Sequence, residues 1–415
     1  MSARPLKVLL HDYSGHAFTA QLARALARRG MAVSYASFSE FGTPKGRVRR
    51  DEADPPGFES HEISFDTPFD KDNLFRRYQQ QQRYARSIAE VALRVAPDVV
   101  LSANSPPEVQ QQLLRAADRV GARFLFWLQD INAEAIGRIL GRRNRLLGAA
   151  AGYYYRRMEQ DLLRRSDRIV AIADDFIDLL GDSWGLDTSR MMVVENWAPL
   201  EDIPLHPREN AWTTSNFRPG RKRIVYSGTL ARKHNPEILV QLAAETDADV
   251  YLFSEGSGAD HVRARQTELG LGNLFVRPWV GVDDLPMMLA GADILCAFIE
   301  PDAGVFSVPS KVLTYLAAGR PILASIPLQN LAARTIERAE AGLVTQPGEM
   351  GAMLRNARKL LDNEPLRHRL GQNGRAYAEA QFDIERIAER FEGVVYQLPL
   401  RTGLPANAVE AYPEA

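Results

Sequence analysis

The chain has 415 residues, more than one ordinary hydrophobic core organises, so two domains are expected. A content of 45% hydrophobic and 25% charged residues is typical of a globular protein, and the formal net charge of −1 gives no indication of nucleic-acid binding. The single cysteine, Cys296, excludes an internal disulfide framework. We recognise no signal peptide and no window near the roughly 18 continuous apolar residues of a membrane span, so a cytoplasmic protein is expected.

The start of the chain has the pattern of a parallel α/β domain. A strand at 6–10, a loop, an amphipathic helix at 18–29 and a second strand at 31–36 follow one another. This order is a βαβ unit, which binds ligands at the carboxyl ends of its strands. Gly15 and His16 lie at that edge. A ligand role and a plain turn glycine beside an incidental histidine are both open interpretations there.

The next part of the chain continues the alternation of strands and helices. A stretch rich in proline, glycine and charge at 41–72 is expected to be a long insertion. A helix is expected at 76–95, with strands at 98–102 and 124–128. Asp130 follows the last of these strands, so it should also lie at the ligand edge.

A basic segment at 141–168 carries eight arginines against three acids, with leucines and tyrosines between them. A helix of this composition can lie on an anionic bilayer surface. The alternative is a domain helix whose apolar stripe faces the core while its arginines are solvated. Both interpretations stay open at this point.

A stretch rich in proline and polar residues after Trp197 marks a domain boundary, and a second series of strands and helices begins at Arg223. The expected organisation is an N-terminal Rossmann-like domain over 1–200, a linker over 201–221, a C-terminal Rossmann-like domain over 222–380, a helix over 381–397 that crosses back to the first domain, and a tail over 398–415.

Three loops of the second domain should meet at one edge of its sheet: 228–233, 255–258 and 307–311. Two lysines, several glycines and a helix N-terminus together predict a diphosphate site. Lys311 is placed in the first turn of a helix that begins near Pro309, where a cation opposes the helix dipole unless an anion lies in front of it. The Walker pattern is not found in these loops, and the glycine-rich dinucleotide fingerprint is not found in either domain.

Several stretches of both domains contain recognisable motifs. They are Leu128-Gln-Asp, Tyr226-Ser-Gly-Thr, Pro278-Trp-Val before an Asp-Leu-Pro, and Pro309-Ser-Lys-x-x-x-Tyr-Leu-Ala-Ala-Gly-x-Pro. From the first strand to about Phe391 the chain resembles the bacterial family 4 (group 1) retaining glycosyltransferases, in the branch that builds exopolysaccharide and O-antigen. The resemblance implies the α/β GT-B fold, with two tandem Rossmann-like domains and a ligand cleft between them.

The resemblance also implies roles for individual residues. The donor diphosphate would be bound by Gly228, Lys233, Ser307, Ser310 and Lys311. The base, ribose and sugar would be held by Pro278, Trp279, Val280, Glu300 and Thr314, and Thr314 stands where the family has the second acid of a paired-glutamate motif. Gly15, His16 and Asp130 would lie on the acceptor side, and Asp130, His16 and Lys233 would be the catalytic residues.

The function that the resemblance implies is transfer of a hexosyl-type sugar from a nucleotide-diphosphate sugar to a glycan or polyprenyl-diphosphate-linked acceptor, with retention at the anomeric carbon. The expected setting is cell-surface polysaccharide synthesis, with the protein peripheral on the inner membrane through 141–168. No cofactor, no metal and no nucleic-acid partner are expected. Two alternatives are an isomerase similar to nucleotide-sugar 2-epimerases, and a non-catalytic partner that binds a nucleotide or carbohydrate.

Overall fold

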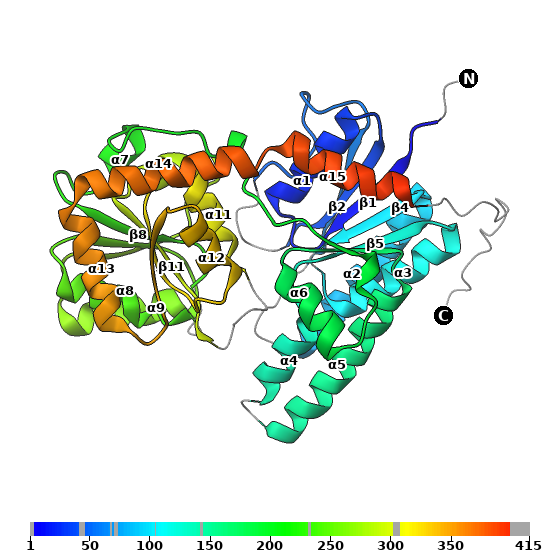
Figure 1. Cartoon of the computed structure of the whole chain (residues 1–415), viewed down its shortest axis with the longest axis horizontal. Helices are drawn as coiled ribbons and strands as arrows, with labels where there is room; N and C mark the ends of the chain where they lie inside the picture. The colour runs from blue at the N-terminus through cyan, green and yellow to red at the C-terminus, as the bar shows by residue number, and fades with distance from the viewer. Residues whose placement is uncertain are drawn as a thin grey trace. The chain divides into compact units, whose positions relative to one another are not determined.

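The computed structural model describes residues 4–40, 46–66, 69, 74–103, 105–141, 144–230, 234–301 and 308–398. Lys233, Ser307 and the tail beyond 398 lie outside this part of the chain, as do two arginines of the basic segment, Arg142 and Arg143. The chain divides into two compact units (Figure 1). Unit 1 comprises 4–40, 47–194 and 385–398, and unit 2 comprises 195–384.

Unit 1 is built on a seven-stranded sheet in the order β3-β2-β1-β4-β5-β6-β7, and every neighbouring pair is parallel. The strands are β1 Lys7–Asp12, β2 Ala32–Phe38, β3 Phe58–Ile63, β4 Val99–Ala103, β5 Arg123–Leu128, β6 Arg168–Ala171 and β7 Met191–Val193. The near-continuous apolar runs of β1, β4 and β5 are those of strands covered on both faces. All the carboxyl ends therefore meet at one edge.

Helices pack against this sheet (Figure 1). They are α1 Ala17–Arg28, α2 Leu74–Val95, α3 Pro107–Val120, α4 Asn132–Gly141, α5 Arg145–Arg165, α6 Asp174–Asp178 with the turns Leu179–Ser183 and Thr188–Arg190, and α15 Ile384–Gln397. Helix α15 packs on unit 1, because the rings of Phe391 and Trp127 lie 4.8 Å apart and Arg29 donates to Glu392 at 2.5 Å. The end of the chain thus completes the unit that its beginning starts.

The segment predicted as an insertion at 41–72 is only partly one. It contains β3, which pairs in parallel with β2 along the sheet edge from Val33 to Phe38. Before β3, the guanidinium of Arg24 is bound at 2.6 Å by Asp54 and by the carbonyls of Arg47 and Arg49. Proline and glycine mark the turns that lead into this edge strand. Because of these residues the whole segment was predicted to be an insertion, and the strand was missed.

Most of the basic segment at 141–168 forms one helix, α5, as expected, and its first residue belongs to α4. Helix α4 ends at Gly141, and α5 begins at Arg145 because the side chain of Asn144 accepts hydrogen bonds from the N–H groups of Leu146 and Leu147. The two helices form an antiparallel hairpin. A Cβ atom on Gly148 would lie 2.3 Å from the Cα of Gly141, so the backbones approach as closely as glycine allows.

Unit 2 has a six-stranded parallel sheet in the order β10-β9-β8-β11-β12-β13. Its strands are β8 Arg223–Ser227, β9 Asp249–Phe253, β10 Leu274–Arg277, β11 Ile294–Phe298, β12 Ile322–Ser325 and β13 Gly342–Thr345. Its helices are α7 Ala211–Asn216, α8 Glu237–Glu245, α9 Ser257–Leu269, α10 Leu285–Ala290, α11 Ser310–Ala317, α12 Leu331–Arg338, α13 Met350–Asp362 and α14 Glu364–Gln381, with a turn at Leu200–Asp202.

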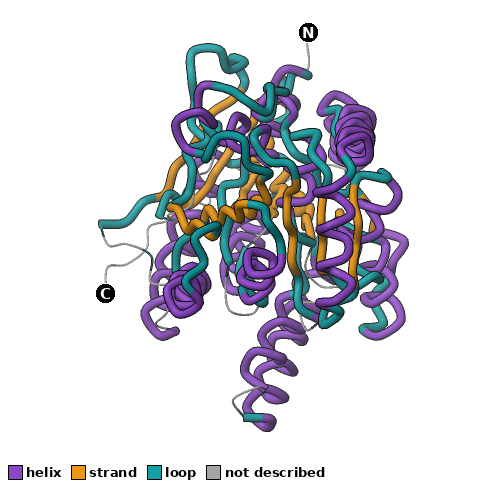
Figure 2. The backbone as a smooth tube through the Cα atoms, turned by 90° about the vertical axis from the view of Figure 1, so that its left-hand side faces the viewer, coloured by secondary structure: helices purple, strands orange, loops and turns teal. Residues whose placement is uncertain are grey.

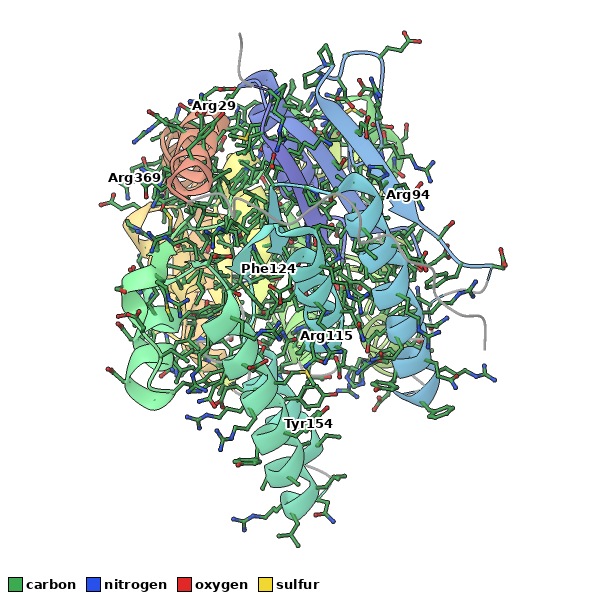
Figure 3. All side chains as sticks on the ribbon, turned by 90° about the vertical axis from the view of Figure 1, so that its right-hand side faces the viewer. Arg29, Arg94, Arg115, Phe124, Tyr154 and Arg369 are labelled. Carbon is green, nitrogen blue, oxygen red and sulfur yellow. The ribbon has the colours of Figure 1, made fainter. Side chains whose placement is uncertain are left out.

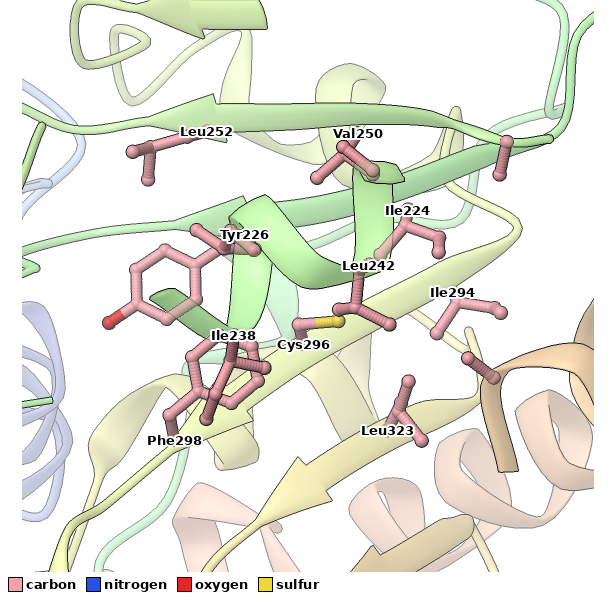
Figure 4. Close-up of a cluster of buried hydrophobic side chains, with 14 of the residues drawn as sticks. Ile224, Tyr226, Ile238, Leu242, Val250, Leu252, Ile294, Cys296, Phe298 and Leu323 are labelled. Carbon is pink, nitrogen blue, oxygen red and sulfur yellow. The ribbon is translucent and has the colours of Figure 1, made fainter. Parts of the chain in front are cut away.

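The core of unit 2 fills the space between this sheet and its helices (Figure 4). Tyr226 of β8 and Phe298 of β11 stack with ring centroids 5.4 Å apart, and Cys296 is buried beside Leu242. Tyr226 is the second-last residue of β8 and Phe298 is the last residue of β11, so the core extends up to the carboxyl edge of the sheet.

The segment predicted as a linker at 201–221 packs on unit 2. Arg208 donates two hydrogen bonds, of 2.9 and 2.7 Å, to the buried carboxylate of Asp293. Arg218 pairs in the same way with buried Asp249. Asp293 and Asp249 lie at the amino-terminal edge of the second sheet, so these arginines attach the segment to that edge.

Candidate active site

Lys311 lies at the carboxyl edge of the sheet of unit 2, in the first turn of α11. Its ammonium nitrogen is 3.6 Å from the centre of the Tyr226 ring, a cation–π distance. The site for a Cβ atom on Gly228 is 3.7 Å from the Cε and Nζ atoms of Lys311, so the loop after β8 runs directly past the ammonium group. With φ at 112°, Gly228 adopts a conformation that side chains rarely tolerate.

Helix α11 is fixed to β8 through Tyr315. The backbone N–H of Ser227 donates to the Tyr315 hydroxyl at 3.0 Å, and this hydroxyl donates to the carbonyl of the same residue at 3.2 Å. Tyr315 lies one helical turn after Lys311 on the same face. The position of Lys311 relative to the loop at Gly228 is therefore set by the hydrogen bonds of a neighbouring turn.

The loops after β8 and β9 interlock. The N–H of Leu230 donates to the hydroxyl of buried Ser254 at 3.2 Å. A Cβ atom on Gly258, in the first turn of α9, would lie 1.9 Å from the carbonyl oxygen of Leu230. Because that neighbour is backbone, only glycine fits at this contact. Two of the three loops predicted to meet at the diphosphate site are thus in direct contact.

Burial lowers the pKa of the Lys311 ammonium to about 7, with the nearby Cys296 acting in the opposite direction. Burial raises the pKa of the Cys296 thiol well above its usual value. An ammonium group in such surroundings gains most from an added anion, because a partner charge would offset its lost hydration. The Lys311 ammonium is therefore suited to bind a negatively charged ligand.

The other residues predicted for the donor lie along the same edge. Pro278, Trp279 and Val280 follow edge strand β10, and Glu300 follows β11, next to β8. All of them except exposed Pro278 are half-buried. On α11, Ser310 is exposed at the first helical position and Thr314 is half-buried one turn later.

On unit 1, Gly15 and His16 follow β1 and Asp130 follows β5, with β4 between the two strands. His16 is held by Asp12, a residue that sequence reasoning missed. The buried carboxylate of Asp12 accepts from the N–H and Nδ1 of His16 at 2.7 and 2.9 Å, and from the hydroxyl of Thr19 at 2.8 Å.

Although burial opposes ionisation of Asp12, the His16 charge and the hydrogen bonds from His16 and Thr19 keep the pKa of this carboxyl below its usual value. An ionised Asp12 can only accept hydrogen bonds, so Nδ1 of His16 carries the proton. The signal for Asp12 was its place as the last residue of the first strand. The first strand was predicted to end at residue 10, which left Asp12 in the following loop.

A second carboxylate that sequence reasoning missed lies beside Asp130. Glu159 of α5 accepts from the N–H groups of Asn132 and Ala133 at 2.9 and 2.8 Å, and so caps the start of α4. Burial, together with the negative charge of Asp130, raises the pKa of Glu159 to about 7 against the effect of these donors. The loop that carries Asp130 is therefore anchored by the hairpin.

Asp12→Asn is expected to destabilise the protein by about 2 kcal/mol at pH 7, because an amide is a weaker acceptor for the His16 and Thr19 donors than a carboxylate is. Because the pKa of Asp12 is depressed, its contribution is complete above the unfolded value near 4 and is lost as the pH falls through the folded pKa. Urea unfolding should show a gap from wild type that is constant above pH 5 and narrows in acid. Asp182→Asn, at an exposed carboxylate, is the control. An equal loss in both variants would contradict the assignment.

Among the described residues, no three histidine, cysteine, aspartate or glutamate side chains are grouped so that they could hold a metal ion. A search of the same residues found no helix with the length and hydropathy needed to span a bilayer.

Two tandem parallel α/β units define the GT-B class of fold. The sequence agrees: residues 15–197 match the glycosyl transferase 4-like domain, and residues 208–377 match the glycosyl transferases of group 1. The chain therefore belongs to the group 1 glycosyltransferases.

Relatives and structural neighbours are consistent with this family. A probable glycosyltransferase, WbjE of Pseudomonas aeruginosa, is 24% identical over 266 residues, which is 62% of this chain and 64% of that protein. The alignment thus spans slightly less than two thirds of the relative. Sucrose-phosphate synthase from Thermosynechococcus elongatus has a TM-score of 0.73 at 15% identity and covers 94% of this chain and 98% of its own. HepE of Anabaena, in complex with UDP and glucose, has a TM-score of 0.69 at 14% identity over 95% of this chain and 100% of its own.

Proposed function

We propose that this protein transfers a sugar from a nucleotide-diphosphate sugar to a glycan or lipid-linked acceptor, with retention of the anomeric configuration. The observation that carries the proposal is Lys311, a cation in the first turn of α11 whose pKa burial has lowered to about 7. Sugar transfer needs a fixed positive charge at the point where the departing diphosphate gains negative charge. HepE, a neighbour of the same fold, has been crystallised with UDP-glucose.

In the proposed reaction the bond between the anomeric carbon and the diphosphate oxygen breaks, and the acceptor hydroxyl bonds to that carbon. Lys311 stabilises the departing phosphate together with the first N–H groups of α11 and the hydroxyl of Ser310. Lys233 and Ser307 are proposed to add to this site. The base, ribose and sugar are assigned to Pro278, Trp279, Val280, Glu300 and Thr314, with Thr314 donating a hydroxyl where an acid would accept. This proposed mechanism requires no metal.

Gly15, His16 and Asp130 are assigned to the acceptor side. Since Asp12 accepts from Nδ1 of His16, the other ring nitrogen of the neutral imidazole, Nε2, is the one that can accept a proton from an acceptor hydroxyl. Asp130 is the second group proposed to orient that hydroxyl. We place the protein peripherally at the inner membrane face, in synthesis of a cell-surface polysaccharide. WaaG, another neighbour of this fold, is involved in lipopolysaccharide biosynthesis.

A thermal-shift panel of uridine, guanosine and adenosine diphosphates, followed by hydrolysis assays with the matching nucleotide sugars, tests the proposal. A ligand that binds the folded state raises the melting temperature by mass action. Slow release of the nucleoside diphosphate from its sugar, with the sugar product unchanged at C2, is the expected result. Conversion of the sugar at C2 would favour the isomerase instead. Tight binding without turnover, even with acceptor extracts, would favour a non-catalytic binding partner.

A further inference from the structure

Large apolar side chains are exposed mainly at one end of unit 1. Eleven large hydrophobic residues are exposed among the described residues, and six of them lie on the first turns of α2 and on α5. They are Phe75, Tyr78, Leu146, Leu147, Tyr153 and Tyr154, with exposures from 48% for Tyr78 to 83% for Leu146. We call these two segments, residues 75–86 and 145–157, the basic-aromatic end.

The two segments are neighbours in space although they are some seventy positions apart in the sequence. The Tyr155 hydroxyl of α5 donates to Glu108 of α3 at 2.7 Å, and Tyr78 of α2 lies close enough to influence the pKa of Tyr155 electrostatically. Figures 1 and 2 show α4 and α5 running together away from the sheet, and Figure 3 shows Tyr154 on this arm. Leu146 and Leu147 lie in the first turn of α5, at the far end of the hairpin.

The two helices of the hairpin pack closely against each other. Gly148 faces Gly141, and Gly152 faces Gly137, where added Cβ atoms would lie 3.2 and 3.3 Å from the opposing Cα. Glycines four residues apart on both helices let the two backbones touch along their length. The exposed leucines are thus carried by a helix that packs closely on a second helix.

The basic-aromatic end is strongly positive. From Leu74 to Ala89 helix α2 has four arginines and no acidic residue, and Glu90 is its first acid. Helix α5 has five arginines and two acids, of which Glu159 is buried under α4. The net charge of the whole chain is −1, so this surplus is a local feature.

We propose that the basic-aromatic end docks on an anionic lipid bilayer, with Leu146 and Leu147 entering the headgroup and acyl boundary and the arginines contacting lipid phosphates. Aromatic and aliphatic side chains among arginines fit this boundary, since the apolar side chains can enter the acyl region while the guanidinium groups stay among the lipid headgroups. A second copy of the chain is a poor occupant, because a two-fold contact would set arginines against arginines. This inference rests on the proposed function, because docking would bring the transferase to a lipid-linked acceptor in the same bilayer.

Co-sedimentation of the full-length protein with vesicles, with and without anionic phosphatidylglycerol, tests the proposal. We expect binding to anionic vesicles that weakens with salt. Leu146→Ser/Leu147→Ser should lower partitioning about tenfold or more, because two apolar side chains are removed from the boundary. Arg145→Gln/Arg157→Gln should lower it about 25-fold, at about fivefold for each arginine.

Matched controls come from unit 2. Leu269→Ser/Leu328→Ser removes two leucines of 47% and 48% exposure, and Arg355→Gln/Arg369→Gln removes two exposed arginines. Both should bind as wild type does. Equal losses in the test and control pairs would overturn the proposal, as would binding to neutral vesicles alone. A dimer in solution that the leucine pair abolishes would assign this end to a second copy of the chain.

The vesicles carry neither donor nor acceptor, so lipid binding is measured independently of sugar transfer. Donor hydrolysis without vesicle binding would refute the docking surface and leave the transferase standing. Vesicle binding without donor binding would refute the transferase and leave the docking surface standing.

Discussion

Lys311→Ala is expected to weaken binding of the preferred nucleoside diphosphate by about 2–3 kcal/mol, which is roughly 30- to 150-fold, because a charge-assisted contact to phosphate is lost. Isothermal titration calorimetry measures this loss directly. Lys359→Ala, which removes an exposed lysine of α13, is the matched control and should leave the affinity unchanged. Affinity within a factor of two of wild type in Lys311→Ala would remove Lys311 from the phosphate site.

The same residue makes binding depend on pH. With the pKa of Lys311 near 7 in the free protein and raised by a bound diphosphate, binding above pH 7 must take up a proton. Affinity should then fall as the pH rises from 7.5 to 9, by up to about tenfold per pH unit. Titrations at pH 8 in buffers of different ionisation enthalpy count that proton. Lys311→Arg keeps a permanent charge, so its complex should form with less proton uptake.

Gly258→Ala is expected to destabilise unit 2 by about 2–4 kcal/mol and to abolish diphosphate binding at millimolar ligand. The added methyl would lie 1.9 Å from the carbonyl oxygen of Leu230, so the loops after β8 and β9 must separate. Overpacking that displaces backbone costs about 1–3 kcal/mol or more. Thermal unfolding and the calorimetric titration used for Lys311 measure the two effects.

Gly272→Ala is the control for this substitution. Gly272 also lies in unit 2, but a Cβ atom there would meet nothing within 4 Å and its φ is not positive. Its stability and affinity should match wild type. A Gly258→Ala protein that keeps both properties would show that the two loops do not need their close contact.

The sequence predicted the parallel sheets and the sheet edge at which the residues proposed to bind the donor lie. Apolar runs such as β1 and β11 allow only a buried strand, and Pro309 and Gly319 mark the two ends of α11. Such signals are local, so each of these elements can be recognised from consecutive residues alone.

What the sequence did not predict depends on partners that are distant in the chain. Strand β3 looked like part of an insertion because its only neighbour is β2. The packing of the linker at 201–221 on unit 2 could not be predicted because Asp293 and Asp249, which bind its arginines, come much later in the sequence. Asp12 was likewise concealed, since its acceptor role depends on how the following turn folds back.

The return of α15 to unit 1 has a consequence for how the protein can be divided. Its Phe391 lies against Trp127, so unit 1 is assembled from two pieces of chain that flank all of unit 2. Unit 2 is in effect an insertion into unit 1, and the polypeptide crosses between the units twice. A single cut near residue 194 would leave the fragments held together, and a gene fragment ending there would encode a sheet with the indole of Trp127 uncovered. Unit 2, which is continuous from 195 to 384, is the part that can be excised as one piece.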